Sequence, residues 1–270
     1  MRTDWDGLVM QVTKQHWREV FLLSAEIQRK IDSLILLMKR KVDAIIAVEK
    51  LQNILAWANQ KSAVVNDTCK PSAIRAFYLS IEIKNSFDDR LSHLIEPSFN
   101  PGISRLLQVD HLLYRCLFHS HSPDFNQPLY TYGSCFSITR YLDFEMFLGE
   151  LLRDSLNLQL DLKKALIKLK LKLPSGQERI NYQQFWHDEG KGWTEELIMN
   201  MSNYCQIRQN WHLNNEQYEL FEQYYNANYL LLDCLNIVTT VSKHVIKEVE
   251  EMLFLPIAEI DKRKYNKQIN

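Results

Sequence analysis

The sequence predicts an all-α protein, a helical array that ends in a compact C-terminal helical bundle. Only 7 glycines and 7 prolines interrupt the 270 residues, which is too few for the many turns of a β-sandwich or β-barrel. Hydrophobic residues make up 46% of the chain, enough for a substantial core. Apolar side chains also recur at helical spacing along most of the length.

The first 96 residues are expected to form an N-terminal helical segment. Two helices are predicted between Leu8 and Ile46 from the apolar spacing, and a third from Val48 to about Gln60. Pro71 suits the first turn of a fourth helix, because the N–H that proline lacks would have no partner there. The predicted buried face of the first helix is Leu8, Val12, His16, Val20, Leu23 and Ile27.

Residues 97–173 are predicted to be a middle helical segment with irregular loops. Proline-containing stretches at 97–102 and 120–133 break the pattern, and a helix is expected between them. The leucine-rich stretch 136–173 is ambiguous, because its leucines alternate with a period of two from Leu156 to Leu162, as in a strand. Its many good helix formers and near lack of β-branched residues favour a helix.

Residues 174–258 are predicted to be the C-terminal helical domain. Asn214 is a suitable N-cap with Gln217 three residues on, and a long helix should follow. A last helix should begin near Ser242 and end before Pro256. The lysine-rich residues 259–270 are expected to be a disordered tail.

Charge and cysteine content narrow the classes of partner. Lysine and arginine total 32 against 33 acidic residues, so no positive field attracts nucleic acid. The five cysteines include no C-x-x-C pair, which fits reduced thiols. The N-terminus lacks the apolar core of a signal peptide, and no apolar run reaches the ~20 residues of a membrane span. We therefore expect a cytoplasmic protein with neither a membrane nor a nucleic acid as partner.

A helical ribonuclease is the main enzymatic alternative. Arg105 with His111, and Arg115 with His121, match a loose Arg-x(4–6)-His spacing in which histidine is a general base and arginine stabilises phosphorane charge. Chance pairs are expected among eight histidines and many arginines. We therefore predict a protein that is not an enzyme and has no catalytic residues and no cofactor.

Other polar clusters have ordinary explanations. Cys116, His119 and His121 could begin a zinc site with Cys135, but two close ligand pairs are absent, so we predict no metal and leave the cluster open. The run His187–Asp188–Glu189 fits a solvated helix end. The lysines of a predicted amphipathic helix fit a solvated surface: Lys163, Lys164, Lys168, Lys170 and Lys172.

Aromatic side chains are the best candidates for partner binding. Large rigid rings bury area at small entropic cost, so they are frequent interface hot spots. Trp211 and Tyr224 are expected in the core. Trp193 and Tyr225 are the predicted partner-binding residues.

The C-terminal block resembles the C-terminal helical domain of bacterial NACHT-family STAND NTPases, signal-transducing ATPases of conflict and antiphage defence systems. The residues that carry the resemblance are Asn210–Trp211, Asn215–Glu216–Gln217, Glu222 to Asn228, Leu231 to Asn236 and Leu253 to Ile257. Upstream, residues 16–23, 36–38, 50–62 and Phe77–Tyr78 resemble the helical segment that follows the NTPase core in the same proteins.

The resemblance implies a sensor, scaffold or autoinhibitory region that acts through protein–protein interaction. The expected partner is a NACHT-type NTPase module in cis or in trans, with an unidentified ligand or phage protein as the signal. A phosphate-binding P-loop is missing, since the sole Gly-Lys pair, Gly190–Lys191, has Phe185 and Gly192 where glycine and a hydroxyl residue are needed. We expect that pair to lie between Trp186 and Trp193 as a connecting loop. A degenerate remnant is the remaining alternative.

Overall fold

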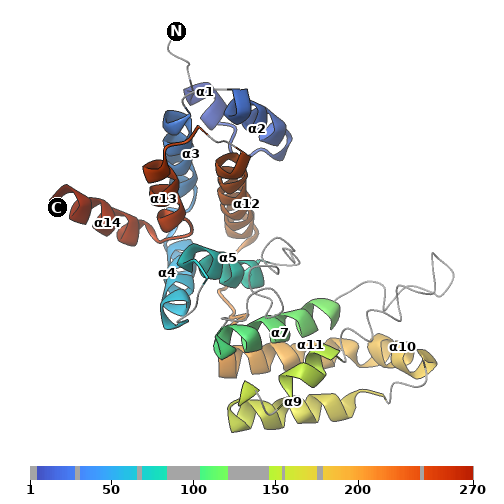
Figure 1. Ribbon diagram of the computed structural model, residues 1–270. Helices are drawn as coiled ribbons and strands as arrows, with labels where there is room; N and C mark the ends of the chain where they lie inside the picture. The colour runs from blue at the N-terminus through green and yellow to red at the C-terminus, as the bar shows by residue number, and fades with distance from the viewer. Residues whose placement is uncertain are drawn as a thin grey trace. The chain divides into compact units, whose positions relative to one another are not determined.

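The computed structural model describes residues 5–27, 31–65, 69–83, 104–120, 146–153, 156–174, 179–237 and 240–269 (Figure 1). Every regular element in these ranges is a helix, which confirms the all-α prediction. Two compact units form, one from Met1–Ile83 with Trp211–Asn270 and the other from Lys84–Asn210. The boundaries expected at 96, 173 and 258 stay predictions, and most of the expected loops at 97–102 and 120–133 lie outside the described residues.

The first unit begins with α1 (Asp6–Val9), η1 (Gln15–Trp17), α2 (Arg18–Ile27) and α3 (Asp32–Ile45). The predicted face of the first helix is wrong for α2, where Phe21 and Ala25 are buried. The exposed apolar side chains there are Val20 at 41%, Leu23 at 54% and Ile27 at 74%. The residues between α1 and η1 are not helical, so the 3.6-residue period does not continue from α1 into α2. The two helices therefore do not share one continuous apolar face.

Helices α4 (Glu49–Val64) and α5 (Pro71–Glu82) pack against each other. Pro71 lies in the first turn of α5, as predicted. Every residue of α5 from Ile74 to Glu82 is buried, including its charged and polar members. This helix therefore lies in the interior of the first unit rather than on its surface.

The same unit is completed by α12 (Asn215–Ile237), α13 (Lys243–Met252) and α14 (Ile257–Ile269). The predicted cap of α12 is confirmed: the Gln217 amide donates to Asn214 Oδ1 at 2.8 Å, and the Asn214 amide donates to Gln217 Oε1 at 3.1 Å. Helix α12 packs on α2 and α3, and α13 packs on α3 and α5. Ser242 precedes α13 and bonds through its amide and hydroxyl to the carboxylate of Asp32.

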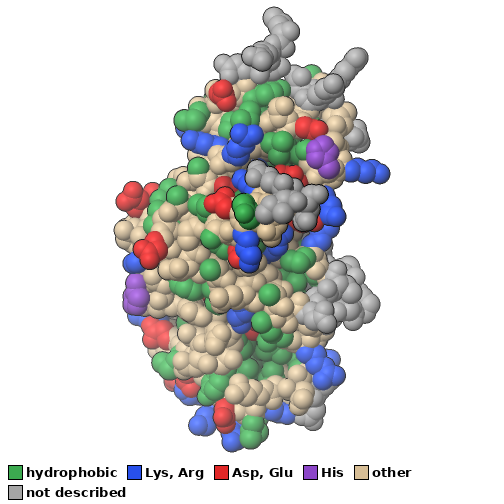
Figure 2. Space-filling model, turned by 90° about the vertical axis from the view of Figure 1, so that its left-hand side faces the viewer, with side chains coloured by type: hydrophobic (Ala, Val, Ile, Leu, Met, Phe, Trp, Pro, Cys, Tyr) green, Lys and Arg blue, Asp and Glu red, His purple; other side chains and the backbone are tan. Residues whose placement is uncertain are grey.

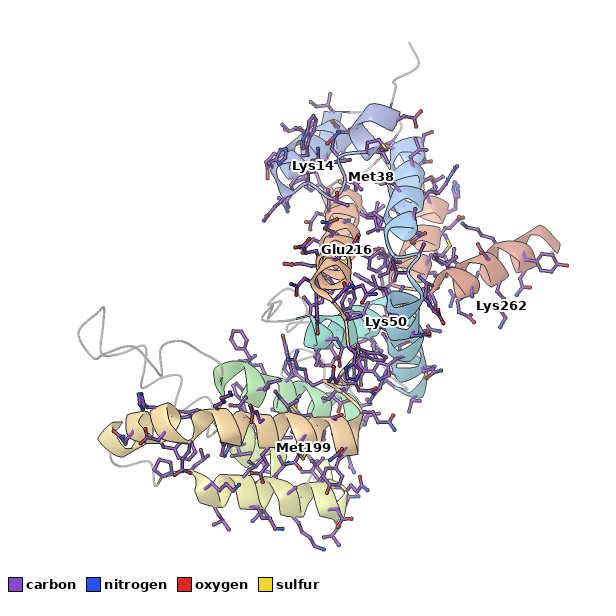
Figure 3. The ribbon with its side chains drawn as sticks, turned by 180° about the vertical axis from the view of Figure 1, so that it is seen from behind. Lys14, Met38, Lys50, Met199, Glu216 and Lys262 are labelled. Carbon is purple, nitrogen blue, oxygen red and sulfur yellow. The ribbon has the colours of Figure 1, made fainter. Side chains whose placement is uncertain are left out.

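The tail expected to be disordered is helical over Ile257–Ile269. The amide of Ile260 donates to the carbonyl of Pro256 at 3.1 Å, and the Ile260 side chain is buried, which anchors the first turn of α14. Beyond this turn the side chains from Asp261 to Asn266 are exposed, and Lys262 points into solvent (Figure 3). The buried side chain of Ile260 thus holds the base of helix α14 on the first unit.

The second unit contains α7 (Arg105–Ser120), α9 (Leu160–Lys172), α10 (Arg179–Asp188), α11 (Gly190–Asn200) and the π-helical turn η4 (Met201–Cys205). Helix α11 packs on α7, α9 and α10. The helix predicted over the leucine-rich stretch is confirmed for 160–172, where Leu162, Leu166 and Leu169 face inward at i, i+4 and i+7. Among the described residues, no helix combines the length and apolar character needed to cross a bilayer.

Candidate functional site

The most distinctive geometry in the first unit is the connection between α13 and α14, residues Leu253 to Ile257, called here the 253–257 turn. Leu253 leaves helical geometry with ψ 133°, and Phe254 adopts a left-handed conformation with φ 59°. Non-glycine residues rarely occupy this region, and holding one there costs about 1–3 kcal/mol. Surrounding contacts must therefore stabilise the turn.

The first stabilising contacts of the turn are those between the ring of Phe254 and α12. Its ring is fully buried among three tyrosines of α12, with centroid distances of 6.1 Å to Tyr224, 5.7 Å to Tyr225 and 6.2 Å to Tyr229. Leu253 and Leu255 on either side are each 1% exposed. The apolar environment holds the ring in place and thereby stabilises the left-handed backbone at Phe254.

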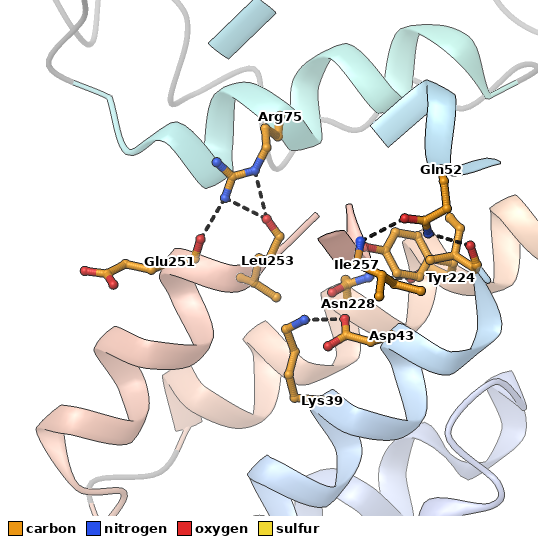
Figure 4. Close-up of polar contacts among 10 residues, drawn as sticks. Lys39, Asp43, Gln52, Arg75, Tyr224, Asn228, Glu251, Leu253 and Ile257 are labelled. Carbon is orange, nitrogen blue, oxygen red and sulfur yellow. Dashed lines mark hydrogen bonds and ion pairs between the residues drawn. The ribbon is translucent and has the colours of Figure 1, made fainter. Parts of the chain in front are cut away.

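Arg75 of α5 supplies the second set of contacts (Figure 4). Its Nε and Nη2 donate to the carbonyl of Leu253 at 3.0 and 2.7 Å, and Nη2 also donates to the carbonyl of Glu251 at 3.0 Å. These carbonyls lie at the C-terminus of α13, where helix carbonyls lack intrahelical partners and the dipole favours a cation. Arg75 is therefore a C-terminal cap for α13 that comes from another helix.

Arg75 is 1% exposed. Burial, followed by the charge of Arg263, lowers the pKa of Arg75 to about 10, while Tyr224 opposes the shift. The side chain remains charged at neutral pH. A buried charge is tolerated only where hydrogen bonds compensate it, and the carbonyls of the 253–257 turn supply those bonds.

Gln52 of α4 holds the other end of the turn. Its Oε1 accepts a hydrogen bond from the amide of Ile257 at 2.8 Å, and its Nε2 donates to the carbonyl of Ile46 at 2.6 Å. One side chain thus connects the end of α3, the body of α4 and the start of α14. We call Arg75, Gln52 and the 253–257 turn the clamp.

A buried ion pair of α3 lies beside the clamp (Figure 4). Lys39 Nζ contacts the carboxylate of Asp43, and Lys39 is 3% exposed. Burial lowers the pKa of Lys39 and raises that of Asp43, and the attraction between the two opposes both shifts. Lys264 and Asp261 of α14 also act on the pKa of Asp43, so a displacement of α14 would change the field at this pair.

The predicted partner-binding residues are not on the surface. Trp193 is 3% exposed, and its Nε1 donates to the carbonyl of Leu169 at 2.9 Å. Tyr225 is also 3% exposed and packs against Tyr229 and Phe254. The expectation that Trp193 and Tyr225 are surface residues is therefore wrong. The ring of Trp193 is buried in the second unit, and the ring of Tyr225 is buried in the first.

The two residues predicted to pack internally, Trp211 and Tyr224, differ in how deeply they are buried. Tyr224 is fully buried, as predicted. Trp211 is half-buried: its ring packs edge-on against Trp57 at 5.7 Å, and its Nε1 donates to Glu82 Oε2 at 3.0 Å. Trp211 thus belongs to the edge of the core in the first unit.

The Arg–His pairs of α7 do not form a ribonuclease site among the described side chains. Arg105 is exposed, whereas His111 is 4% exposed and lies on a different face of the same helix. Burial, followed by the charge of Arg115, lowers the pKa of His111 to about 4. A histidine of this kind is neutral and enclosed at physiological pH. His121, the partner predicted for Arg115, lies outside the described residues.

Of the four candidate zinc ligands, Cys116 is the one whose side chain the structure describes. Cys116 is fully buried, and burial raises the pKa of its thiol. The side chain of His119, together with His121 and Cys135, lies outside the described part of the chain. No group of three metal-ligating side chains occurs among the described residues. His187 and Asp188 are exposed at the end of α10, as expected for a solvated helix end.

Gly190 and Lys191 begin α11 directly after α10, so the pair lies in a helix and not in the expected connecting loop. Gly190 is buried, and a Cβ there would lie 2.4 Å from Cε3 of Trp186. The rings of Trp186 and Trp193 meet edge to face at 5.5 Å. Glycine is required at this position for the close packing.

Sequence reasoning missed Arg75 of the clamp and the Lys39–Asp43 ion pair beside it. Two signals pointed to these residues. Arg75 is flanked by the apolar residues Ile74, Ala76 and Phe77, and Lys39 precedes Asp43 by four residues, so the two share a face of their helix. A charge inside an otherwise apolar helix is a recognisable mark of a buried, bonded side chain.

Comparison with known proteins adds one match. Residues 162–256 match the family model described as NACHT C-terminal Helical domain 2. No curated protein and no solved structure matches the chain. The matched stretch runs from α9 to Pro256 within the 253–257 turn, and it is similar to a C-terminal helical domain of NACHT proteins.

Proposed function

We propose that this chain is a non-enzymatic helical region that regulates a NACHT-type NTPase in a bacterial conflict or antiphage defence system. It would act in the cytoplasm as a sensor, scaffold or autoinhibitory element. The NTPase module would be in the same polypeptide or in a separate one. The observation that carries the proposal is the family match over residues 162–256, the end of which is held by the clamp.

The clamp supports a role in signal transmission. Its turn belongs mostly to the matched stretch, whereas Arg75 and Gln52 come from helices that precede it. A movement of α13 or α14 must break the hydrogen bonds of Arg75 and Gln52 or carry α4 and α5 along. A switch needs an element that repacks between two discrete arrangements, and we propose that the clamp is that element.

The described residues that the sequence suggested for catalysis, metal binding or phosphate binding have structural roles. His111 and Cys116 are enclosed in the second unit, and Gly190 makes room for a tryptophan ring. Among the buried charges of the first unit, Arg75 bonds to a helix end, Lys39 pairs with Asp43, and Glu82 accepts a hydrogen bond from Trp211. These roles favour a regulatory module over the ribonuclease alternative.

The proposal is tested by measuring binding of the full chain to the NACHT NTPase module encoded with it. The module is loaded either with a non-hydrolysable ATP analogue or with ADP. A regulator can shift a switch only through different affinities for its two states, typically by 5–150-fold. We expect a difference in this range. Equal affinity for both states, no binding in either, or RNA cleavage by the chain alone would contradict the proposal.

A further inference from the structure

Helix α9 has an outward face that no described helix covers. Its inward residues Leu162, Leu166 and Leu169 are buried, and α9 packs on α11. On the opposite side, Leu160 is 64% exposed, Ile167 42% and Leu171 80%. Figure 2 shows exposed hydrophobic side chains interspersed with basic and acidic ones on the surface.

The exposed apolar residues form a narrow seam. At about 100° per residue, Leu160, Ile167 and Leu171 fall within an arc of about 40°. With Lys164 they occupy the d, a, d and a positions of two successive heptads. A bilayer-bound helix instead presents an apolar face about 100° wide or more, commonly with aromatic residues. The narrow seam therefore fits a partner helix better than a lipid surface.

Lysines border this seam on both sides. Lys163 and Lys170 occupy the g positions, and Lys168 occupies an e position. The helix carries five lysines and one aspartate, Asp161, which lies 3.7 Å from Lys164. Lys172 lies outside the seam and pairs with Glu196. The border of the seam thus keeps a strong excess of positive charge.

We propose that the seam of α9 docks one amphipathic α-helix with acidic residues at the positions that face the lysines. Leucine-like side chains of that helix would cover Leu160, Ile167 and Leu171, and its glutamates or aspartates would pair with Lys168 and Lys170. Charges at e and g positions set partner choice in coiled coils. They also oppose pairing of two copies through this seam, since lysines would face lysines. The inference goes beyond the proposed function and does not depend on it.

The test uses the full chain and two labelled peptides of three heptads, each with leucine at a and d. One peptide has glutamate at e and g, and the other has lysine. Fluorescence anisotropy should show that the acidic peptide binds and the basic one does not. The double variant Lys168→Glu, Lys170→Glu should bind the acidic peptide at least roughly tenfold more weakly and gain affinity for the basic one.

Lys191→Glu is the matched control, because Lys191 is an exposed lysine of α11 outside the seam. It should leave binding of the acidic peptide unchanged, and circular dichroism should show that all variants fold. Vesicles containing one third phosphatidylserine separate the lipid alternative. The inference is overturned if the acidic peptide does not bind, if the double variant binds both peptides as wild type does, or if vesicles bind wild type while neither peptide does.

Discussion

Replacing Arg75 by methionine tests the clamp most sharply. Methionine keeps an unbranched apolar side chain in the same space but removes all donors. The carbonyls of Leu253 and Glu251 then lose the guanidinium bonds at 2.7 to 3.0 Å. Orphaning the buried carbonyl of Leu253, which loses two bonds to a charged group, costs about 3 kcal/mol, and orphaning the partly buried carbonyl of Glu251 costs about 1 kcal/mol. Losing the cation at the end of α13 costs about 1 kcal/mol.

One effect of Arg75→Met acts in the opposite direction. Burial lowers the pKa of Arg75 from 12.5 to about 10, so the charge costs about 3 kcal/mol more in the folded chain than in water. Methionine removes that cost. The stability lost with the hydrogen bonds and the cation exceeds the stability gained by removing the buried charge. We therefore expect the substitution to lower the free energy of unfolding of the first unit by about 2 kcal/mol.

The assay is urea unfolding followed by circular dichroism, with wild type and Arg18→Met measured in parallel. Arg18 makes an exposed ion pair with Asp233 at 2.9 Å, so its replacement should cost less than about 1 kcal/mol. The urea midpoint of Arg75→Met should fall while the slope of the transition stays the same. The reasoning is refuted if Arg75→Met is as stable as wild type, or if both variants lose the same stability.

Two further predictions concern the second unit. Unfolded histidine binds a proton below about pH 6.5, whereas folded His111 does so only below about pH 4, so stability should fall by up to about 3 kcal/mol as pH drops through that window. His111→Gln should reduce the difference in stability between pH 7 and pH 4.5, measured by urea titration. The same substitution at the exposed His187, made as a control, should leave that difference unchanged. Gly190→Ala should destabilise by roughly 1–3 kcal/mol, because its Cβ would overlap the ring of Trp186. A Cβ added at Gly192 would meet no atom within 4 Å, so Gly192→Ala should leave the melting temperature unchanged or raise it slightly. Equal melting temperatures for the two alanine variants would contradict this packing account.

The sequence predicted the helices best where local signals specify them. The cap formed by Asn214 and Gln217 and the start of α5 at Pro71 depend on neighbouring residues alone, and both are present. The helix predicted through the alternating leucines forms from Leu160 on, where helix propensity outweighs the period of two, but residues 157–159 before α9 are not helical.

Burial was predicted less well, because it depends on contacts between distant parts of the chain. The face of α2 was placed wrongly once a break before η1 changed the helical phase. Trp193 and Tyr225 were expected outside, yet their neighbours in space enclose them. Arg75 was missed for the same reason, since the carbonyls that bind it are more than 170 residues away in sequence.

The most direct test of the regulatory account is the rate of ATP turnover by the NACHT NTPase module, measured with and without the full chain. The chain alone should hydrolyse no ATP, and adding it should change the turnover of the module in a saturable way. Turnover that stays constant at concentrations where the chain is bound to the module would contradict the account, as would hydrolysis of ATP by the chain alone.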